Sequence, residues 1–174
     1  MVSNHLLEIN FNLSETNMNR PILYMLVGVP ASGKTFWRKN CNTPHTTVCT
    51  DDIIYRIGEK YGMTYDEIFN EAINLAQKIM NHNIQSAIAG NKNIVWDQTN
   101  LTAKSRKRKL LRLPGYQKVA VYFETPESSI HKLRLISRNG KTIPASVLAS
   151  MMHVLEKPTK SEGFDRIIDA SIEF

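Results

Sequence analysis

The chain has 174 residues, a formal charge of +6 at pH 7 and two cysteines, Cys41 and Cys49, that form no C-x-x-C pair. This length suits one domain with a sizeable core, and the lack of a long apolar run or signal-peptide core excludes a membrane-spanning chain. We therefore expect a reduced, cytoplasmic protein without a membrane partner, whose positive charge suits a polyanionic partner.

The first twenty residues carry no strong periodicity. Residues 6–11 alternate weakly between apolar and polar side chains, which indicates an edge strand, and residues 12–20 read as a polar linker. We therefore divide the chain into an N-terminal extension, residues 1–20, and one domain, residues 21–174.

The domain begins with an apolar strand at 22–27, the segment GVPASGKT at 28–35 and a helix to about residue 41. The segment is a complete G-x-x-x-x-G-K-[ST] pattern, and strand, turn and helix are the context that this phosphate-binding loop requires. A tight glycine turn without a nucleotide is the alternative interpretation.

Each polar position of the loop has a predicted part in nucleotide binding. Backbone N–H groups around Gly28, Ser32 and Gly33 point at an anion, which the helix dipole also favours. Lys34 is predicted to reach the β- and γ-phosphates, and the Thr35 hydroxyl to ligate Mg²⁺.

A short β-branched strand at 46–49 ends at two adjacent carboxylates, where a helix starts at 50–52. Asp51 is the candidate general base, because it follows a strand beside the loop and can accept a proton from a substrate hydroxyl. Asp51 acting only as the helix N-cap is the alternative, and Asp52 competes with it for the role of base.

A long helix is predicted over 64–89. Thr64 and Glu67 form a capping-box pattern at its start, and Gly90 ends it. Apolar residues then recur at roughly helical spacing: Ile68, Ala72, Leu75, Ile79, Ile84 and Ile88.

A third strand, at 93–96, ends at Asp97. An acidic residue in this place holds the Mg²⁺ water shell in many P-loop enzymes, so Asp97 is a candidate metal residue together with Thr35. A capping role, or positioning of the turn at Thr99 and Asn100, is the alternative.

A basic helix is predicted over 102–113. Helical spacing spreads its cations over several faces, so it is either a solvated surface or a salt-sensitive track for a phosphate backbone. Trp37 and Trp96 are expected in the core. The basic side chains are Lys104, Arg106, Lys107, Arg108, Lys109 and Arg112.

The last third of the domain contains a strand at 118–123, a helix at 126–137, a helix from Pro144 to about 156 and a strand at 165–169. Residues 140–144 read as a short lid. Arg134 and Arg138 lie on one helix face before the lid, where they could clamp nucleotide phosphates or simply match the charge of the helix C-terminus.

Strands that alternate with helices predict an α/β fold with a mainly parallel central sheet flanked by helices. Such sheets bind ligands at the carboxyl ends of their strands. Gly28, Asp51 and Asp97 each follow a separate predicted strand, so we expect them at one edge of the sheet.

The chain resembles the 5′-polynucleotide kinases of phages and bacterial RNA-repair enzymes over nearly all residues after 20. The resemblance implies an adenylate-kinase-like P-loop kinase that uses ATP and Mg²⁺ to phosphorylate the 5′-hydroxyl of DNA or RNA. It also implies Asp51 as general base, with Arg134 and Arg138 in the lid clamp. It rests on the ordered segments 28–37, 50–52, 97–100, 134 with 138, 143–144, 147–148 and 161–165.

The sequence departs from this family at one position. Members carry an arginine three residues after the base, where this chain has Ile54, and Arg56 stands four residues after Asp52. We expect Asp52, Arg56, Thr99, Asn100 and Arg106 to contact the substrate.

Two other functions stay open at this stage. One is a kinase of a hydroxymethylated pyrimidine within phage DNA, of a nucleoside or of another small metabolite. The other is a non-catalytic, ATP-gated nucleic-acid binder. The sequence leaves the oligomeric state open.

Overall fold

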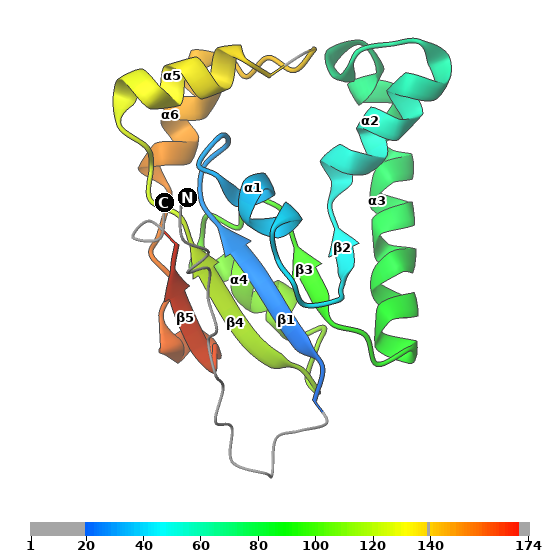
Figure 1. The fold of residues 1–174 in the computed structure, drawn as a ribbon, viewed down its shortest axis with the longest axis vertical. Coiled ribbons are helices and arrows are strands. Elements are labelled where there is room, and N and C mark those ends of the chain that lie inside the picture. The colour runs from blue at the N-terminus through cyan, green and yellow to red at the C-terminus, as the bar shows by residue number, and fades with distance from the viewer. Residues whose placement is uncertain (1–19, 139, 171–174) are drawn as a thin grey trace, which may run out of the picture.

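A computed structural model describes residues 20–138 and 140–170, and the edge strand expected at 6–11 lies outside them. Within the described chain, five parallel strands form one sheet in the order β2-β3-β1-β4-β5 (Figure 1). The strands are β1 (Ile22–Val27), β2 (Thr46–Val48), β3 (Ile94–Trp96), β4 (Gln117–Tyr122) and β5 (Arg166–Asp169).

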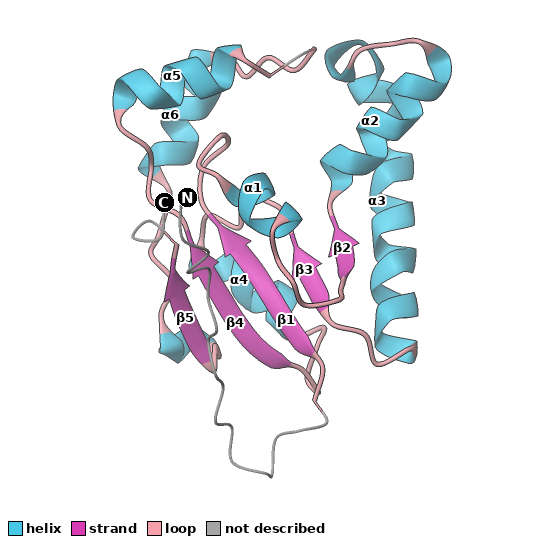
Figure 2. Ribbon diagram, viewed as in Figure 1, coloured by secondary structure: helices cyan, strands magenta, loops and turns pink. Residues whose placement is uncertain are grey.

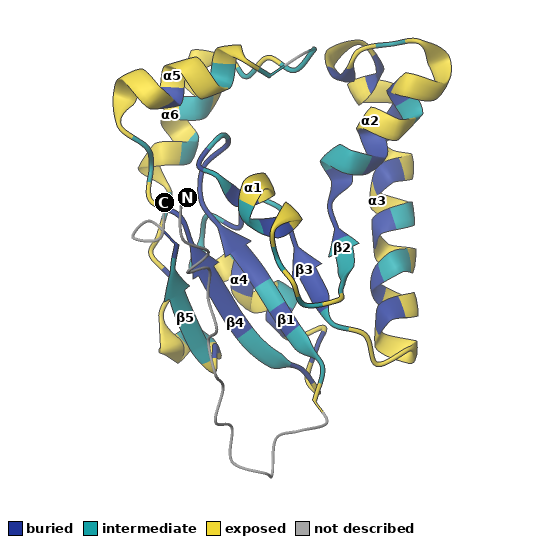
Figure 3. Cartoon of the chain, in the orientation of Figure 1, coloured by how far each residue is buried: buried dark blue, intermediate teal, exposed yellow. Residues whose placement is uncertain are grey.

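The apolar strand β1 lies at the centre of the sheet. Its residues pair with β3 on one side and with β4 on the other, and Val27, the last residue of β1, lies opposite Tyr122 of β4. Strands β1, β3 and β4 are largely buried, as expected for a parallel sheet that helices cover (Figure 3). This confirms the predicted α/β class.

Helices lie on both faces of the sheet and rise beyond its carboxyl edge (Figure 2). Helix α1 lies in front of the sheet in this view and α4 behind it, while α2 with α3 and α5 with α6 stand on opposite sides of the edge. The bounds are α1 (Lys34–Lys39), α2 (Thr50–Tyr61), α3 (Tyr65–Ala89), α4 (Ala103–Leu110), α5 (Ser128–Ile136), α6 (Ala145–His153) and the 3₁₀ turn η2 (Lys160–Glu162).

Helix α3 begins at the predicted capping box. The Thr64 hydroxyl accepts from the backbone N–H of Glu67, and the Glu67 carboxylate accepts from Thr64. The predicted apolar stripe is partly wrong, because Leu75 and Ile88 are exposed. The stripe that packs on the core repeats almost every four residues: Ile68, Ala72, Ala76, Met80, Ile84 and Ala87.

No helix within residues 20–138 and 140–170 has the length and apolarity to cross a membrane. Helix α5 carries large exposed apolar side chains (Figure 3): Leu133 and Ile136 are 69% and 71% exposed.

Candidate functional site

The loop at 28–35 leaves the carboxyl end of β1 and turns into α1. Gly33 has a φ of +108° and Ala31 a φ of +62°, so the chain reverses through left-handed conformations that favour glycine at position 33. A Cβ at Gly28 would lie 2.9 Å from the carbonyl oxygen of Phe123, which explains the glycine there.

Lys34 folds over the loop that carries it. Its ammonium donates to the carbonyl oxygens of Gly28 (2.8 Å) and Val29 (2.5 Å), and its side chain is buried. Burial lowers the pKa of Lys34 to about 8, against the opposing effect of Asp97. The loop therefore holds a cation at the point where it would meet a phosphate.

Two cavities flank the loop, of about 1010 Å³ and about 700 Å³. Ala31, Lys34, Thr35 and Arg138 line both of them. The larger one is also lined by the three carboxylates that follow β2 and β3, whereas the smaller one is lined by residues of α5 and residues after β4. The three carboxylates are Asp51, Asp52 and Asp97.

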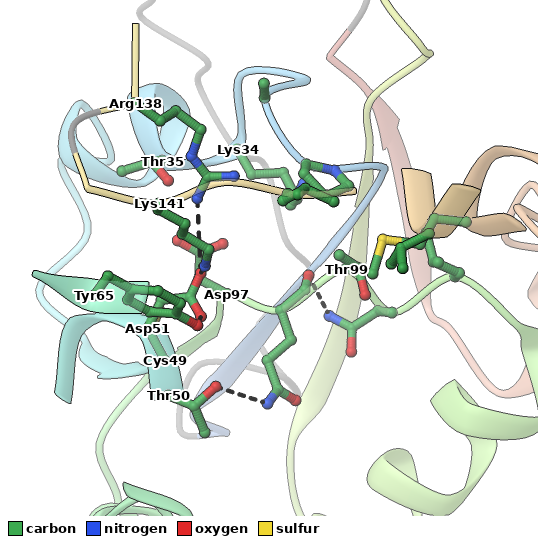
Figure 4. A pocket seen from close by; sticks show the side chains of 18 of the residues that line it. Lys34, Thr35, Cys49, Thr50, Asp51, Tyr65, Asp97, Thr99, Arg138 and Lys141 are labelled. Atoms are coloured by element: carbon green, nitrogen blue, oxygen red, sulfur yellow. Dashed lines mark hydrogen bonds and ion pairs between the residues drawn. The ribbon is translucent and has the colours of Figure 1, made fainter. Parts of the chain in front are cut away.

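Asp51 lies in the first turn of α2 and faces the larger cavity (Figure 4). The N-cap of α2 is Cys49, so Asp51 does not cap the helix. One carboxylate oxygen of Asp51 accepts from the Tyr65 hydroxyl at 2.8 Å. The other accepts from the Lys141 ammonium, with Arg138 3.9 Å away. The side chain is thus held on both oxygens.

Asp52 has a different environment from Asp51. Its carboxylate accepts two hydrogen bonds from the guanidinium of Arg38, on α1. The Nε atom of the same guanidinium lies 3.2 Å from Asp97. Arg38 is buried, so this cation joins the carboxylates that follow β2 and β3.

Asp97 follows β3 and is 7% exposed. Burial raises the pKa of its carboxyl above the ordinary value, although Arg38 and Lys34 oppose that rise. The Thr35 hydroxyl and Asp97 line the same cavity as Asp51 and Asp52. Hydroxyl and carboxylate oxygens are the ligands that Mg²⁺ prefers, usually with substrate phosphates completing the shell, so these residues fit a magnesium ion.

Described residues contain no cluster of three or more His, Cys, Asp or Glu side chains close enough to hold a metal by themselves.

The turn after Asp97, at the end of β3, is hydrogen-bonded to the end of β1. The Asn100 amide donates to the carbonyl of Leu26 (2.7 Å), and the backbone N–H of Gly28 donates to the carbonyl of Thr99 (3.0 Å). Asn100 is 2% exposed and has a φ of +49°. Thr99 and Asn100 both line the larger cavity, and Asn100 also fixes the turn.

The lid, residues 140–144, reaches from α5 to the start of α3. The carbonyl of Gly140 accepts from the backbone N–H of Asp66 (3.0 Å), and the Asp66 carboxylate accepts from the N–H of Thr142 (2.7 Å). Arg138, directly before the lid, lines both cavities, whereas Arg134 lines only the smaller one. Of the two arginines predicted to clamp phosphates, Arg138 therefore lies where the two cavities meet, and Arg134 lies beside the smaller cavity.

Two of the residues predicted to contact the substrate do not line either cavity. Arg56 is exposed, does not line either cavity, and its Nε donates to the carbonyl of Asp52 one helical turn earlier. Arg106 is fully buried and donates to Glu162 and to backbone carbonyls. Arg106 is buried because it lies on the same face of α4 as Leu110, and its ion pair with Glu162 joins α4 to η2.

Sequence reasoning missed four contributors to this site. Tyr65 and Lys141 hold Asp51, and Arg38 joins the other two carboxylates. His131 is buried, and its Nε2 lies 2.8 Å from the carbonyl oxygen of Pro30 in the loop. No local motif marks these residues. Only the capping box at Thr64 indicated that Tyr65 would begin a helix.

A protein-family model described as an AAA domain, AAA_33, matches residues 23–158. Heterogeneous nuclear ribonucleoprotein U-like protein 2 of Mus musculus and of Homo sapiens are each 24% identical over 160 residues. The match covers 86% of this chain and 21% of theirs, so the chain spans about a fifth of the length of these relatives.

Three solved structures share the fold. A proposed kinase from Chloroflexus aurantiacus has a TM-score of 0.61 at 14% identity, covering 88% of this chain and 90% of that chain. A chain of the Pnkp1/Rnl/Hen1 RNA repair complex has a TM-score of 0.59 at 23% identity, covering 88% and 49%. A gluconokinase from Sinorhizobium meliloti has a TM-score of 0.50 at 20% identity, covering 88% and 84%. At these identities the likeness shows the P-loop kinase fold.

Proposed function

This chain belongs to the AAA domain family AAA_33 and has the P-loop kinase fold, and we propose that it is an ATP-dependent kinase of a nucleic-acid hydroxyl, most specifically the 5′-OH end of DNA or RNA. One observation carries the proposal. Two cavities meet at Lys34, Thr35 and Arg138, and Asp51 stands in only the larger one. A donor on one side and an acceptor on the other would exchange a phosphoryl group at that junction.

On the donor side, the smaller cavity would hold ATP with its phosphates on the loop. Lys34 would exchange its carbonyl partners for the β- and γ-phosphates, and Arg134 and Arg138 would neutralise charge that spreads over the transferring group. Mg²⁺, held by Thr35 and Asp97, would supply further neutralisation of the phosphate oxygens.

On the acceptor side, Asp51 would accept the proton of the attacking hydroxyl. The hydroxyl oxygen forms a bond to the γ-phosphorus, the bond between that phosphorus and the β-phosphate oxygen breaks, and ADP leaves. The ammonium of Lys141 donates to Oδ2 of Asp51, so the acceptor hydroxyl would replace Lys141 at that oxygen. The Tyr65 hydroxyl would stay bound to Oδ1.

Four observations support a nucleic acid as the acceptor. The chain carries a charge of +6, and Lys104, Lys107 and Arg108 are exposed on α4, next to the larger cavity. The curated relatives are named ribonucleoproteins, and one structural neighbour belongs to an RNA repair complex.

A second candidate acceptor follows from Ile54. This residue is fully buried in the core, and Arg56 does not line either cavity, so no cation of α2 in the cavity wall takes the place expected beside an end phosphate. A kinase of a hydroxymethylated base within DNA, or of a small metabolite, would not need that cation.

The test is transfer of label from γ-labelled ATP in the presence of Mg²⁺. Matched 5′-OH and 5′-phosphate oligonucleotides, as DNA and as RNA, are compared with DNA that contains 5-hydroxymethyluracil. We expect label on 5′-OH ends only. Label that follows the hydroxymethyl base would establish the second candidate. Nucleotide-dependent binding without any transfer would make the protein an ATP-gated binder and refute both kinase proposals.

A further inference from the structure

Lys109 is a cation in the wall of the larger cavity, on the inner face of α4. Its ammonium donates to the side-chain oxygens of Gln98 (2.8 Å) and Asn100 (2.5 Å) and lies 5.3 Å from the centre of the Trp96 ring. The Trp96 indole also donates to the Gln98 oxygen, at 2.9 Å. The ammonium is therefore fixed by uncharged groups on the turn after β3.

No carboxylate among the described residues pairs with Lys109 or acts on its charge, in contrast to Arg138, Lys141 and Lys34. Lys141 and Arg138 are near Asp51, and Lys34 lies on its loop near Asp97.

Two cations act on the charge of Lys109, Arg108 of α4 and Arg112 just after it, and the groups that Lys109 contacts on β3 and the following turn are neutral. Burial lowers the pKa of Lys109 to about 8, and the two arginines contribute to that lowering. A half-buried ammonium in this setting has lost water without gaining a counter-ion, so an anion would stabilise it.

An ammonium has three N–H donors, and two of those of Lys109 are used by Gln98 and Asn100. The third is available to a ligand. Ser105 and Thr99 line the same cavity and offer hydroxyl groups to a ligand there.

We propose that Lys109 forms an anion subsite of the acceptor cavity, which binds a phosphate group attached to the acceptor and so takes the place of the cation that Ile54 cannot supply. The subsite rests on the proposed function in that it treats this cavity as the acceptor side. Its ligand class is a sugar phosphate in which the phosphate and the reacting hydroxyl are on the same nucleoside. The smallest member is a nucleoside 3′-monophosphate with a free 5′-hydroxyl.

The subsite has a characteristic dependence on pH. A bound phosphate favours the charged form of Lys109, so binding takes up a proton where the free side chain is partly neutral. The affinity for the phosphate is therefore expected to fall as the pH rises through about 8, the pKa of Lys109. An arginine at this position stays charged and would not show that fall.

The experiment is calorimetric binding of a nucleoside 3′-monophosphate and of the matching nucleoside to the full chain. Wild type is compared with Lys109→Gln, Lys109→Arg and the control Lys78→Gln, which changes an exposed lysine of α3. Thermal melts identify any variant that is not folded.

We expect wild type to bind the phosphate at least ~10-fold more tightly than the nucleoside, the strength of a charge-assisted hydrogen bond. Lys109→Gln should abolish that preference while nucleoside binding is retained. Lys109→Arg should keep the preference and lose its pH dependence near 8, and Lys78→Gln should behave as wild type.

A preference that persists in Lys109→Gln, or one that wild type lacks, would overturn the subsite. Because binding is measured without ATP, this result is independent of transfer. A wild-type protein that binds the phosphate through Lys109 but transfers no label to any acceptor would refute the kinase and leave the subsite standing.

Discussion

The hydroxyl of Tyr65 donates a 2.8 Å hydrogen bond to Oδ1 of Asp51, and the two residues lie in the first turns of consecutive helices, α3 and α2. Tyr65 is 7% exposed, and its ring packs against those of Tyr55 and Phe69, with centroid distances of 4.9 and 5.5 Å. Burial and the neighbouring carboxylate raise the pKa of the Tyr65 hydroxyl. The hydroxyl therefore stays a donor throughout the neutral range and fixes the orientation of Asp51.

Tyr65→Phe should lower kcat by ~10-fold or more without a matching rise in the KM for ATP, because a hydrogen bond to a charged group is removed. Steady-state kinetics at varied ATP concentration measure kcat and the KM for ATP.

Tyr116→Phe is the matched control, because its hydroxyl donates to the carbonyl of Lys92 outside both cavities. If Tyr65→Phe and Tyr116→Phe change kcat equally, Tyr65 has only a packing role. In the background of Asp51→Asn, Tyr65→Phe should have little further effect on kcat.

Asp51→Asn and Asp52→Asn should separate catalysis from stability. Asp51→Asn is expected to lower kcat by on the order of 100-fold or more, as for loss of a general base. Asp52→Asn removes a charge partner of the buried Arg38 and should mainly lower the melting temperature. Equal melting curves, with activity lost only in Asp52→Asn, would identify Asp52 as the base.

Lys34→Met should abolish ATP binding and yet stabilise the fold near pH 7. The folded pKa of Lys34 is about 8 and its ordinary value is 10.5, so between these values the unfolded chain binds more protons. Wild-type stability should therefore rise with pH across that window, and the charge on Lys34 costs stability below it.

Urea unfolding at pH 7, 8.5 and 10 measures this dependence. The slope should be smaller in Lys34→Met than in wild type, and Lys109 accounts for a remaining rise, since burial lowers its pKa to about 8 as well. A Lys34→Met protein that is less stable than wild type at pH 7 would show that its hydrogen bonds outweigh the cost of burying its charge.

The phosphate-binding loop could be predicted from the sequence because its geometry is local. Gly33 supplies the left-handed turn, and the rule for parallel sheets places Asp51 and Asp97 at the same edge as the loop. Lys141 could not be predicted in the same way. It lies 90 residues from Asp51 in the chain, and their interaction depends on how the lid docks on α3.

The burial of Arg106 in the basic helix, unlike the contact of Lys141, could be predicted from a local pattern. Arg106 lies four residues before Leu110 and seven before Leu113, both buried, so helical spacing puts it on the inner face. The partner of that buried cation, Glu162, is 56 residues away, which no local pattern reveals.

Arg106→Met should destabilise the fold by about 3–5 kcal/mol, because it leaves the Glu162 carboxylate without its buried partner. Arg108→Met, an exposed change on the same helix, should stay within about 0.5 kcal/mol of wild type. Chemical denaturation checks both. Unchanged stability of Arg106→Met, together with weaker nucleic-acid binding, would restore Arg106 as a substrate contact.

Replacing Lys104, Lys107 and Arg108 by glutamine should flatten the salt dependence of oligonucleotide binding. On a single strand, the log–log slope should decrease by up to about 0.7 for each phosphate that the helix no longer neutralises. The control replaces three exposed lysines on other helices, Lys39, Lys60 and Lys78, and removes the same charge. Equal slopes for the two triple variants would mean that α4 makes no particular contact with the phosphate backbone.

Two hydrogen bonds between the turn after β3 and the end of β1 have a mechanical consequence. Asn100 is bonded to Leu26, and Gly28 to Thr99, so the phosphate-binding loop and the Asp97 turn are joined where they leave the sheet. Thermal displacements of the loop and of Asp97 should therefore be correlated. Structural rearrangement during turnover would then be confined to the helices and the lid, while the loop and the Asp97 turn keep constant distances from each other.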